Sequence, residues 1–346
     1  MFANFFSHLP RTYLIAEIGV NHNGDVALAR EMVRAAHTAG ADAVKFQTFT
    51  AAALVTPGTP KVHYQDNSTT PDESHFEMIR RLELSEAGHR ELFAFCAEVG
   101  IDFLSTPYDV ESARFLDALG VRLFKTASAD IVDLPLQAVI AATGKPSIVA
   151  TGMADLGEVE QAVDVYARAG NPHLVLLHCV SNYPCSDASL NLRAMQTLAH
   201  AFGVPVGYSD HSEGFLAAVA SVAMGATVIE KHFTLDRALP GPDHRASSTP
   251  AEFAELTAHV RRIEAMLGSA RKARQPEEQQ MAEVSRKSLV LARAVRSGST
   301  ITAEDLRLMR PGTGIPSSFL GAIVGKRSTA DLPALHRLCW HDVEGA

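Results

Sequence analysis

The sequence predicts a (β/α)8 barrel, the TIM barrel, followed by a small β-rich domain. Eight short runs of β-branched and aliphatic residues alternate with amphipathic stretches of helical periodicity. The runs are nearly uniformly apolar, as strands buried on both faces are. A doubly wound open sheet is the alternative fold for such an alternation. The predicted strands are Tyr13–Gly19, Asp42–Gln47, Ile101–Thr106, Val121–Thr126, Pro146–Thr151, His173–Cys179, Val204–Ser209 and Ala226–His232.

Helical patterns connect these runs, and glycines mark the passages from helix to strand. Glycine tolerates the positive φ that the end of a helix often requires. The predicted helices include Val26–Ala39, Glu86–Val99, Val110–Leu119, Leu156–Ala169 and Phe215–Met224. The glycines in these passages are Gly40, Gly100, Gly120, Gly170, Gly203 and Gly225.

Two departures from this alternation predict the domain organisation. A long polar segment, about residues 48–85, follows the second strand, and a long βα loop lies over the active-site face of a barrel, so it is a candidate lid. After the helix at residues 250–267 the pattern changes. We expect residues 1–269 to form the barrel, residues 270–284 a charged, glutamine-rich linker, and residues 285–346 a separate domain of short strands and turns.

Composition and charge exclude several classes of protein. The 346 residues carry a formal net charge of −8, with a pI of about 6.0, which argues against a nucleic-acid-binding surface. The four cysteines show no metal-ligand pair spacing, so a reducing compartment is the simplest inference. The N-terminal residues lack the pattern of a signal peptide, and no apolar run approaches the ~18–20 residues of a membrane span. We therefore expect a cytoplasmic protein without nucleic-acid or membrane partners.

Polar side chains gather at the C-terminal ends of the predicted strands, where TIM barrels carry their active sites. Two lysines with neighbouring hydroxyl groups match an anion site for a phosphate with a carboxylate nearby. Aldolases and phosphosugar isomerases share such a site, so it does not by itself select a reaction. The strand-end residues are Glu17, Lys45, Gln47, Ser105, Thr106, Lys125, Ser128, Thr151, Gly152, His178, Ser181, Tyr183, Ser209, Asp210, His211, Glu230, Lys231 and His232.

The histidines and the first carboxylate suggest more specific roles. His211 and His232 end consecutive strands, so their imidazoles can face each other and bind Mn, Fe, Co or Zn with positions left open. Hydrogen-bonded packing is the alternative for each, and His22 in the first βα loop is a third candidate. Glu17 is either a general base or acid, or a partner of Lys45 or Lys231 in an ion pair.

Six longer motifs and the tail resemble the sialic acid synthase family. The motifs are Ala16–Gly24, Ala41–Gln47, Thr151–Met153, Gly207–His211, Glu230–Asp236 and Gly241–Ser247. The tail at residues 286–343, including Arg310, resembles the antifreeze-like (SAF) domain that ends those synthases. The resemblance implies condensation of phosphoenolpyruvate with N-acetylmannosamine or a 2,4-diacetamido hexose, with release of phosphate. It also implies a divalent metal, Mn2+ or alternatively Mg2+ or Co2+.

Family roles transfer to matching positions of this sequence. The metal ligands match His211 and His232, and the acid of the first strand matches Glu17, which with Lys45 and Lys125 we expect to be catalytic. The family also forms a domain-swapped homodimer in which Arg310 would enter the partner's active site. The resemblance implies phosphoenolpyruvate contacts from Lys45, Thr106, Lys125, Ser128, Ser181 and Ser209. It implies sugar contacts from Gln47, Asp130, Tyr183, Asp243 and Arg310.

Three positions depart from the family pattern. Ala150 stands where a serine often precedes Thr-Gly-Met, so one phosphate hydroxyl is missing. Asp130 replaces a glutamate that is often found there, and its shorter side chain puts its sugar contact in doubt. Residues 334–337 replace a glycine-containing turn. The stretch at residues 241–247 is closer to neuraminic or legionaminic acid synthases than to the pseudaminic branch.

Two other functions compete with the synthase. A Schiff-base aldolase would use Lys45 or Lys125 as its nucleophile and would not depend on a metal. A catalytically inactive barrel with a ligand-binding tail is the non-enzymatic alternative. The presence of His211, His232 and Glu17 together with both lysines argues against the second.

Overall fold

The computed structural model describes residues 4–56, 58–61 and 73–345. The chain divides into two compact units, Met1–Gly268 and Ser269–Ala346. Each unit has its own apolar core, and each is described by itself below.

The first unit is a parallel barrel. Its strands follow the order β3-β2-β1-β8-β7-β6-β5-β4, so each strand pairs with a neighbour in sequence and β1 also pairs with β8. A doubly wound sheet would instead reverse its strand order at a switch point. The predicted TIM barrel is confirmed as a nearly closed, eight-stranded parallel barrel. Its strands are β1 (Tyr13–Gly19), β2 (Ala43–Thr48), β3 (Asp102–Pro107), β4 (Phe124–Thr126), β5 (Ser147–Ala150), β6 (Leu174–Cys179), β7 (Val206–Asp210) and β8 (Val228–His232).

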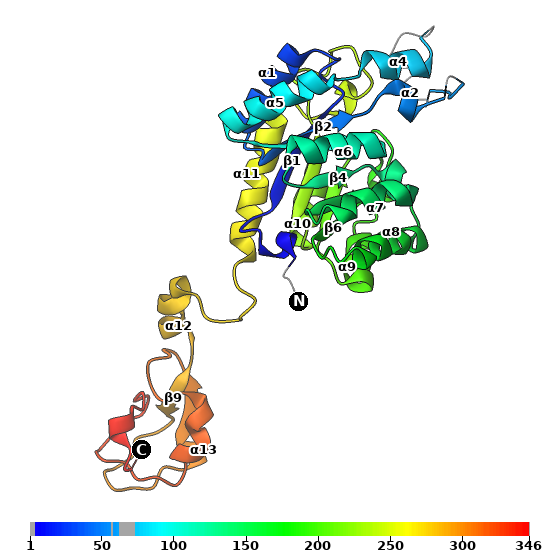
Figure 1. Cartoon of the computed structure of the whole chain (residues 1–346). Helices are drawn as coiled ribbons and strands as arrows, with labels where there is room; N and C mark the ends of the chain where they lie inside the picture. Colours follow the sequence, from blue (N-terminus) through cyan, green and yellow to red (C-terminus); the bar gives the residue numbers. More distant parts are fainter. Residues whose placement is uncertain (1–3, 57, 62–72, 346) are drawn as a thin grey trace. The chain divides into compact units, whose positions relative to one another are not determined.

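Helices surround the strands (Figure 1). Most of them begin at a side chain that accepts a hydrogen bond from the first turn, which satisfies a backbone donor that the helix leaves free. The helices are α1 (Val26–Thr38), α5 (Glu86–Val99), α6 (Val110–Leu119), α7 (Leu134–Ala142), α8 (Leu156–Arg168), α9 (Ala194–Phe202), α10 (Leu216–Ala223) and α11 (Pro250–Leu267). The capping residues are Asp25, Ser85, Asp109, Asp133, Asp155 and Thr249.

Alternation along the strands separates two environments. Successive side chains of a strand point to opposite faces, so one set packs beneath the helices and the other enters the barrel. The inner apolar cluster comprises Phe6, Ile15, Ala43, Leu104, Leu123, Ile148, Val175, Leu177 and Val228. Two residues further along seven of the strands, at the same parity, stand Glu17, Lys45, Thr106, Lys125, Ala150, Cys179 and Glu230, and on β7 Ser209 follows Gly207 in the same way. The polar ring therefore lies directly on the inner apolar layer, at the C-terminal end of the barrel.

The predicted lid contains two short helices in its described part. These are α2 (Ala51–Leu54) and α4 (His75–Arg81). Phe49, Met78 and Leu82 pack with Val20 in a small apolar cluster near the C-terminal ends of the strands. Residue 57 and residues 62–72 of the predicted lid lie outside the described residues.

The second unit is small and partly β-structured, as expected for the tail. Strands β9 (Ser288–Leu291) and β10 (Leu306–Met309) pair antiparallel, and the short helix α13 (Leu320–Ile323) contributes Ile323 to the core. The stretch predicted as a linker includes the helix α12 (Gln279–Ser285). Across the described residues of both units, no helix is long and apolar enough to cross a membrane.

Candidate active site

A cavity of about 410 Å³ opens at the C-terminal ends of the strands. It collects side chains from all parts of the barrel sequence, because parallel strands bring their C-terminal ends to one face. Of the residues expected in the site, it is lined by Glu17, Lys45, Gln47, Lys125, Ser128, Ser181, Tyr183, Ser209, His211, His232 and Asp243. Glu230, for which no role was predicted, also lines it.

A chain of buried charges crosses the floor of this cavity. Lys45 Nζ lies 2.6 Å from Glu17 Oε2 and 3.8 Å from Glu230 Oε2. Lys125 Nζ lies 3.4 Å from Glu230 Oε1, which also accepts a hydrogen bond from Ser209 Oγ at 2.9 Å. Two carboxylates and two ammonium groups thus compensate one another where isolated charges would be strongly unfavourable. Glu17 pairs with Lys45, which settles the choice between Lys45 and Lys231 that the sequence left open.

The two carboxyl groups differ in proton affinity. Burial raises the pKa of Glu17 to about 7, because desolvation outweighs the attraction of Lys45. Desolvation also acts on Glu230, but Lys125 and Lys45 together outweigh it and lower its pKa to about 2. Near neutral pH Glu230 is therefore the fixed negative charge, and Glu17 is the carboxyl group able to exchange a proton.

Hydroxyl groups converge beside Lys125 around a glycine. A Cβ on Gly152 would lie 2.4 Å from Ser181 Oγ, 2.7 Å from Ser128 Oγ and 2.9 Å from Cys179 Sγ. Such distances exclude any side chain at this position, so the glycine keeps a small polar cradle open. Ala150 also lines the cavity and offers no hydroxyl group. The cradle can bind an oxyanion through Ser128 and Ser181 with the charge of Lys125 nearby.

His211 and His232 face each other at the same end of the barrel, with ring centroids 5.6 Å apart. His211 Nδ1 lies 2.8 Å from the carbonyl oxygen of Val180. A carbonyl only accepts, so Nδ1 carries the proton and Nε2 keeps a free lone pair. His232 Nδ1 is buried without a hydrogen-bond partner, at 4.0 Å from Asp243 Oδ2.

These histidines have the chemistry of metal ligands. Desolvation lowers the pKa of both imidazoles, so both are neutral near pH 7, as metal binding requires. Among the described residues no group of three or more His, Cys, Asp and Glu is arranged to hold a metal. The donor set therefore fits an open site in which two imidazoles are the protein ligands and the other positions belong to water or substrate.

Two expected residues of the barrel are not among those that line the cavity, and a third belongs to the second unit. Thr106 lies beneath Lys45 and accepts a hydrogen bond from its Nζ at 3.0 Å. Asp130 lies in the 3-10 helix Ser128–Val132, and the structure does not place it among the residues that line the cavity. Its Oδ2 is buried without a hydrogen-bond partner, and burial raises its pKa to about 7. Arg310 belongs to the second unit, where it follows β10 and is exposed.

The remaining histidine candidates have structural environments. His22 Nδ1 accepts a hydrogen bond from the Gly24 backbone at 2.9 Å, and His22 is not among the residues that line the cavity. His178 bonds through Nε2 to the carbonyl oxygen of Leu190 at 2.7 Å. Tyr183, by contrast, packs on the His211 ring with centroids 4.2 Å apart. It therefore forms a wall of the cavity beside the two facing histidines.

Glu230 was expected at a strand end, but the sequence alone assigned it no role. It lies two positions before His232 on β8, and the same parity turns both side chains into the barrel. The two-residue spacing from His232 could therefore have predicted that Glu230 enters the barrel interior. Its partners could not be foreseen, because Lys45 and Lys125 reach it from β2 and β4 across the barrel interior.

Comparisons with known proteins identify the family of the chain. The NeuB family matches residues 32–272, and the SAF domain matches residues 286–344. The chain is 46% identical to the N,N'-diacetyllegionaminic acid synthase of Legionella pneumophila over 96% of this chain and 94% of that protein. It is 36% identical to the human N-acetylneuraminate-9-phosphate synthase over 91% of this chain and 88% of that protein.

A solved structure of a related synthetase also superposes on this chain. The N-acetylneuraminic acid synthetase of Leptospira borgpetersenii, crystallised with citrate, superposes with a TM-score of 0.70 at 34% identity. The alignment covers 79% of this chain and 90% of that one. With the family match spanning most of the barrel and the SAF match following it, the chain belongs to the NeuB family.

Proposed function

We propose that this protein condenses phosphoenolpyruvate with an N-acetylated amino hexose and releases phosphate, producing a nine-carbon sialic-acid-type sugar. The observation that carries the proposal is the single cavity that joins the Glu17–Lys45–Glu230–Lys125 charge chain to two neutral, facing histidines. The first group suits a phosphorylated carboxylic acid, and the second suits the activation of an aldehyde. The family membership supports the same pairing of substrates.

Phosphoenolpyruvate would bind over the charged floor. Lys45 and Lys125 offset its negative charge, and Ser128 and Ser181 donate hydrogen bonds to its phosphate. Ser181 supplies the hydroxyl that Ala150 lacks, since both line the same cavity and Gly152 leaves the space between the hydroxyl groups open. Binding in this orientation would aim the methylene carbon at the second substrate.

The amino sugar would bind in its open-chain form between Gln47, Tyr183 and Asp243, which line the rest of the cavity. We propose that His211 and His232 hold a divalent ion, Mn2+ or alternatively Mg2+ or Co2+. When bound, such an ion supplies Lewis-acid polarisation of the aldehyde oxygen. Tyr183, packed on the His211 ring, would exclude water from that side of the aldehyde.

The bond changes then follow from the positions of the side chains. The methylene carbon of phosphoenolpyruvate bonds to the aldehyde carbon, whose oxygen takes up a proton, and carbon 2 becomes electron-deficient. Water adds to carbon 2, and Glu17 accepts the proton that this water loses. The resulting tetrahedral centre expels phosphate by cleavage of the carbon–oxygen bond, and the proton of its new hydroxyl group passes to the departing phosphate as the ketone forms at carbon 2. The proton taken up by Glu17 balances the one that the aldehyde oxygen gained. Glu230 remains ionised throughout and keeps both lysines in place.

A 2,4-diacetamido hexose is the acceptor that we favour over N-acetylmannosamine. Proteins named N,N'-diacetyllegionaminic acid synthase are 46% and 42% identical to this chain. The human N-acetylneuraminate-9-phosphate synthase is 36% identical, and a pseudaminic acid synthase of Campylobacter jejuni is 32% identical. The acceptor preference of the more similar relatives is therefore the better guide.

A phosphate-release assay tests this function. With phosphoenolpyruvate and Mn2+ present, we expect the highest kcat/KM with the 2,4-diacetamido mannose analogue, a lower value with N-acetylmannosamine and none with the 2,4-diacetamido altrose analogue. Phosphate release that does not require any amino sugar would contradict the proposal. Covalent trapping by borohydride with pyruvate would favour the Schiff-base aldolase, although Glu17 and Glu230 raise the pKa of Lys45 against its desolvation and so keep it protonated.

Chelation tests the metal. Thorough treatment with EDTA should abolish phosphate release, and added Mn2+ should restore it, because the aldehyde would otherwise lack an electrophilic partner. His211→Ala and His232→Ala should lose activity while the thermal unfolding transition persists. Activity that survives complete chelation would contradict the metal role. It would not contradict the condensation, which the phosphate-release assay tests separately.

The role of Glu17 predicts a pH dependence. Because the carboxylate is the active form and its pKa is about 7, kcat/KM should rise as the pH increases through 7. Glu17→Gln should lower kcat by about 10²–10⁴-fold and remove this limb of the profile. Glu91→Gln, on the outer face of α5, is the matched control and should keep both. If kcat/KM of the Glu17→Gln protein still rises through pH 7, a group other than Glu17 is responsible for that pH dependence.

We also propose a domain-swapped homodimer in which Arg310 serves the partner's barrel. Mixing Arg310→Ala with Lys45→Ala chains under conditions that exchange subunits should restore activity that neither variant has alone. A random one-to-one mixture of dimers would recover about one quarter of wild-type activity, since half the dimers carry one complete site. No recovery in mixed dimers verified by mass spectrometry would place Arg310 outside the partner's site.

A further inference from the structure

A buried ion pair lies behind the two facing histidines. Lys231 Nζ is 2.9 Å from Asp210 Oδ2, with the two side chains 3% and 0% exposed. The two residues are partners in the register of β7 and β8. Each is next in sequence to one histidine, Asp210 to His211 and Lys231 to His232.

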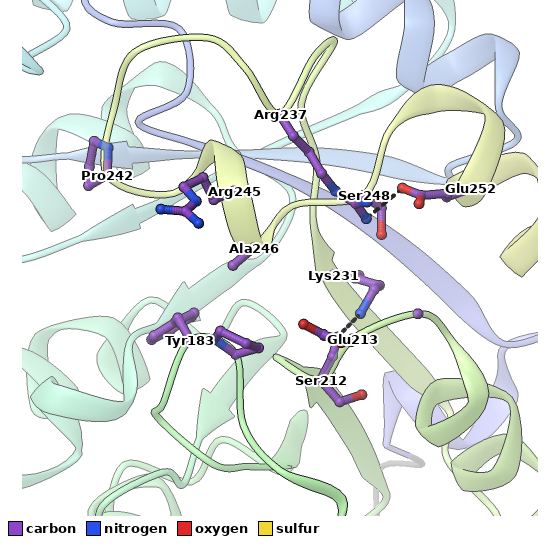
Figure 2. Close-up of a pocket in the computed structure, with 12 residues that line it drawn as sticks. Tyr183, Ser212, Glu213, Lys231, Arg237, Pro242, Arg245, Ala246, Ser248 and Glu252 are labelled. Atoms are coloured by element: carbon purple, nitrogen blue, oxygen red, sulfur yellow. Dashed lines mark hydrogen bonds and ion pairs between the residues drawn. The ribbon is translucent and has the colours of Figure 1, made fainter. Parts of the chain in front are cut away.

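The pair faces away from the substrate cavity. His232 points into the barrel, and alternation turns its neighbour Lys231 to the opposite face of β8. There Lys231 lines a second cavity of about 540 Å³, together with Ser212, Arg237 and Arg245 (Figure 2). Lys231 is not among the residues that line the substrate cavity. Any effect of this lysine on catalysis must therefore act through other residues.

The same pair ties down the backbone on both sides of His211. Lys231 Nζ donates to the carbonyl oxygen of Ser212 at 3.0 Å (Figure 2). Asp210 Oδ1 accepts from the Ser212 backbone N–H at 2.9 Å and from Ser212 Oγ at 2.6 Å. His211 follows the last residue of β7 and lies outside the regular ladder. One ammonium group thus links the residues before and after His211 to the strand that carries His232.

Stability alone is a weak reason for such a pair. Replacing a buried ion pair with apolar groups of similar size is often neutral or stabilising, because desolvation offsets the attraction. The directional bonds of the pair instead fix where the loop after β7 lies. That loop carries one proposed metal ligand, and β8 carries the other.

We propose that Asp210 and Lys231 are positioning residues that hold His211 and His232 at the separation required by a divalent ion. This inference rests on the proposed two-histidine metal site. The pair acts from the far face of β7 and β8 and touches no substrate. Partners behind metal ligands typically change metal affinity by 10–100-fold when they are removed.

The test compares metal binding in the full-length protein without substrate. Asp210→Asn/Lys231→Met removes both charges together, so neither is left buried and unpaired. We expect its Mn2+ dissociation constant, measured by calorimetry, to rise about 10–100-fold. The visible absorption bands of the Co2+-loaded protein should shift, because they report ligand geometry. At saturating Mn2+ the KM for phosphoenolpyruvate should stay within about twofold of wild type, because the pair does not contact that substrate.

Arg237→Met/Glu252→Gln provides the matched control. It removes another ion pair that lines the same second cavity, at 2.8 Å, but whose members do not adjoin either histidine. Its Mn2+ affinity and Co2+ spectrum should equal those of the wild type. If the Asp210→Asn/Lys231→Met protein does not fold, Asp210→Asn/Lys231→Gln, which also leaves no charge buried and unpaired, is measured in the same way and should weaken Mn2+ binding several-fold.

The outcomes separate this inference from the proposed function. Wild-type Mn2+ affinity and an unaltered Co2+ spectrum in a folded Asp210 variant would overturn the positioning role alone. Wild-type protein that binds neither ion would overturn the metal site, and the positioning role with it. Weakened binding in the Asp210 variants, together with wild-type binding in the Arg237 control, supports both.

Discussion

The compensation of charge inside the barrel is the constraint on which the rest of the site depends. Glu17, Lys45, Glu230 and Lys125 are all buried, and removing one member would leave its partner charged in a medium that solvates it poorly. Four strands must therefore end at compatible heights to bring these groups together. The inner apolar layer below them sets that height, because each polar residue stands two positions beyond an apolar one.

The same arrangement bears on the binding of the anionic substrate that we propose. The floor carries equal numbers of acidic and basic groups, but the two carboxyl groups respond differently to added negative charge. Glu230, held between two lysines, stays ionised, whereas Glu17 already has a pKa of about 7. A bound anion beside Glu17 raises that pKa further, since like charges disfavour ionisation. Lys45, 2.6 Å from Glu17, must counter that effect, because Glu17 has to stay ionised to accept a proton from water in the proposed reaction.

Much of this was predictable because TIM-barrel strands give strong sequence signals. All eight predicted strands are found to within a few residues, since each is a short apolar run followed by polar residues. The fourth shows the limit. It was predicted from Val121 and begins at Phe124, because the backbone bends at residues 122 and 123 before it joins the ladder.

The sequence predicted which residues gather in the candidate site, but not which of them contact one another. The rule that barrels work at their C-terminal ends identified Lys45 and Glu17 but could not show that they form an ion pair at 2.6 Å. Parity along β8 would have excluded Lys231 as a partner of Glu17, since His232 and Lys231 must face opposite ways. Asp130 was expected to contact the sugar only because of the family resemblance, with doubt because its side chain is shorter than the usual glutamate. It lies in the 3-10 helix Ser128–Val132 and is not among the residues that line the cavity, so its sugar contact stays a prediction.

The cavity has two unlike sides, which bear on how acceptors are distinguished. The floor is charged and fixed by ion pairs across the barrel, and it meets the reacting carbons that all acceptors of the proposed reaction share. Sugars that differ only at a distant substituent present the same groups to this floor, so it contributes little to discrimination. The opposite wall contains Leu54, Met78 and Ile79 from the lid helices. An apolar wall of this kind favours a methyl-bearing acetamido group over a hydroxyl, which loses hydration there. In the proposed reaction, the strands would therefore supply the chemistry, and selection among acetylated sugars would fall to the lid helices.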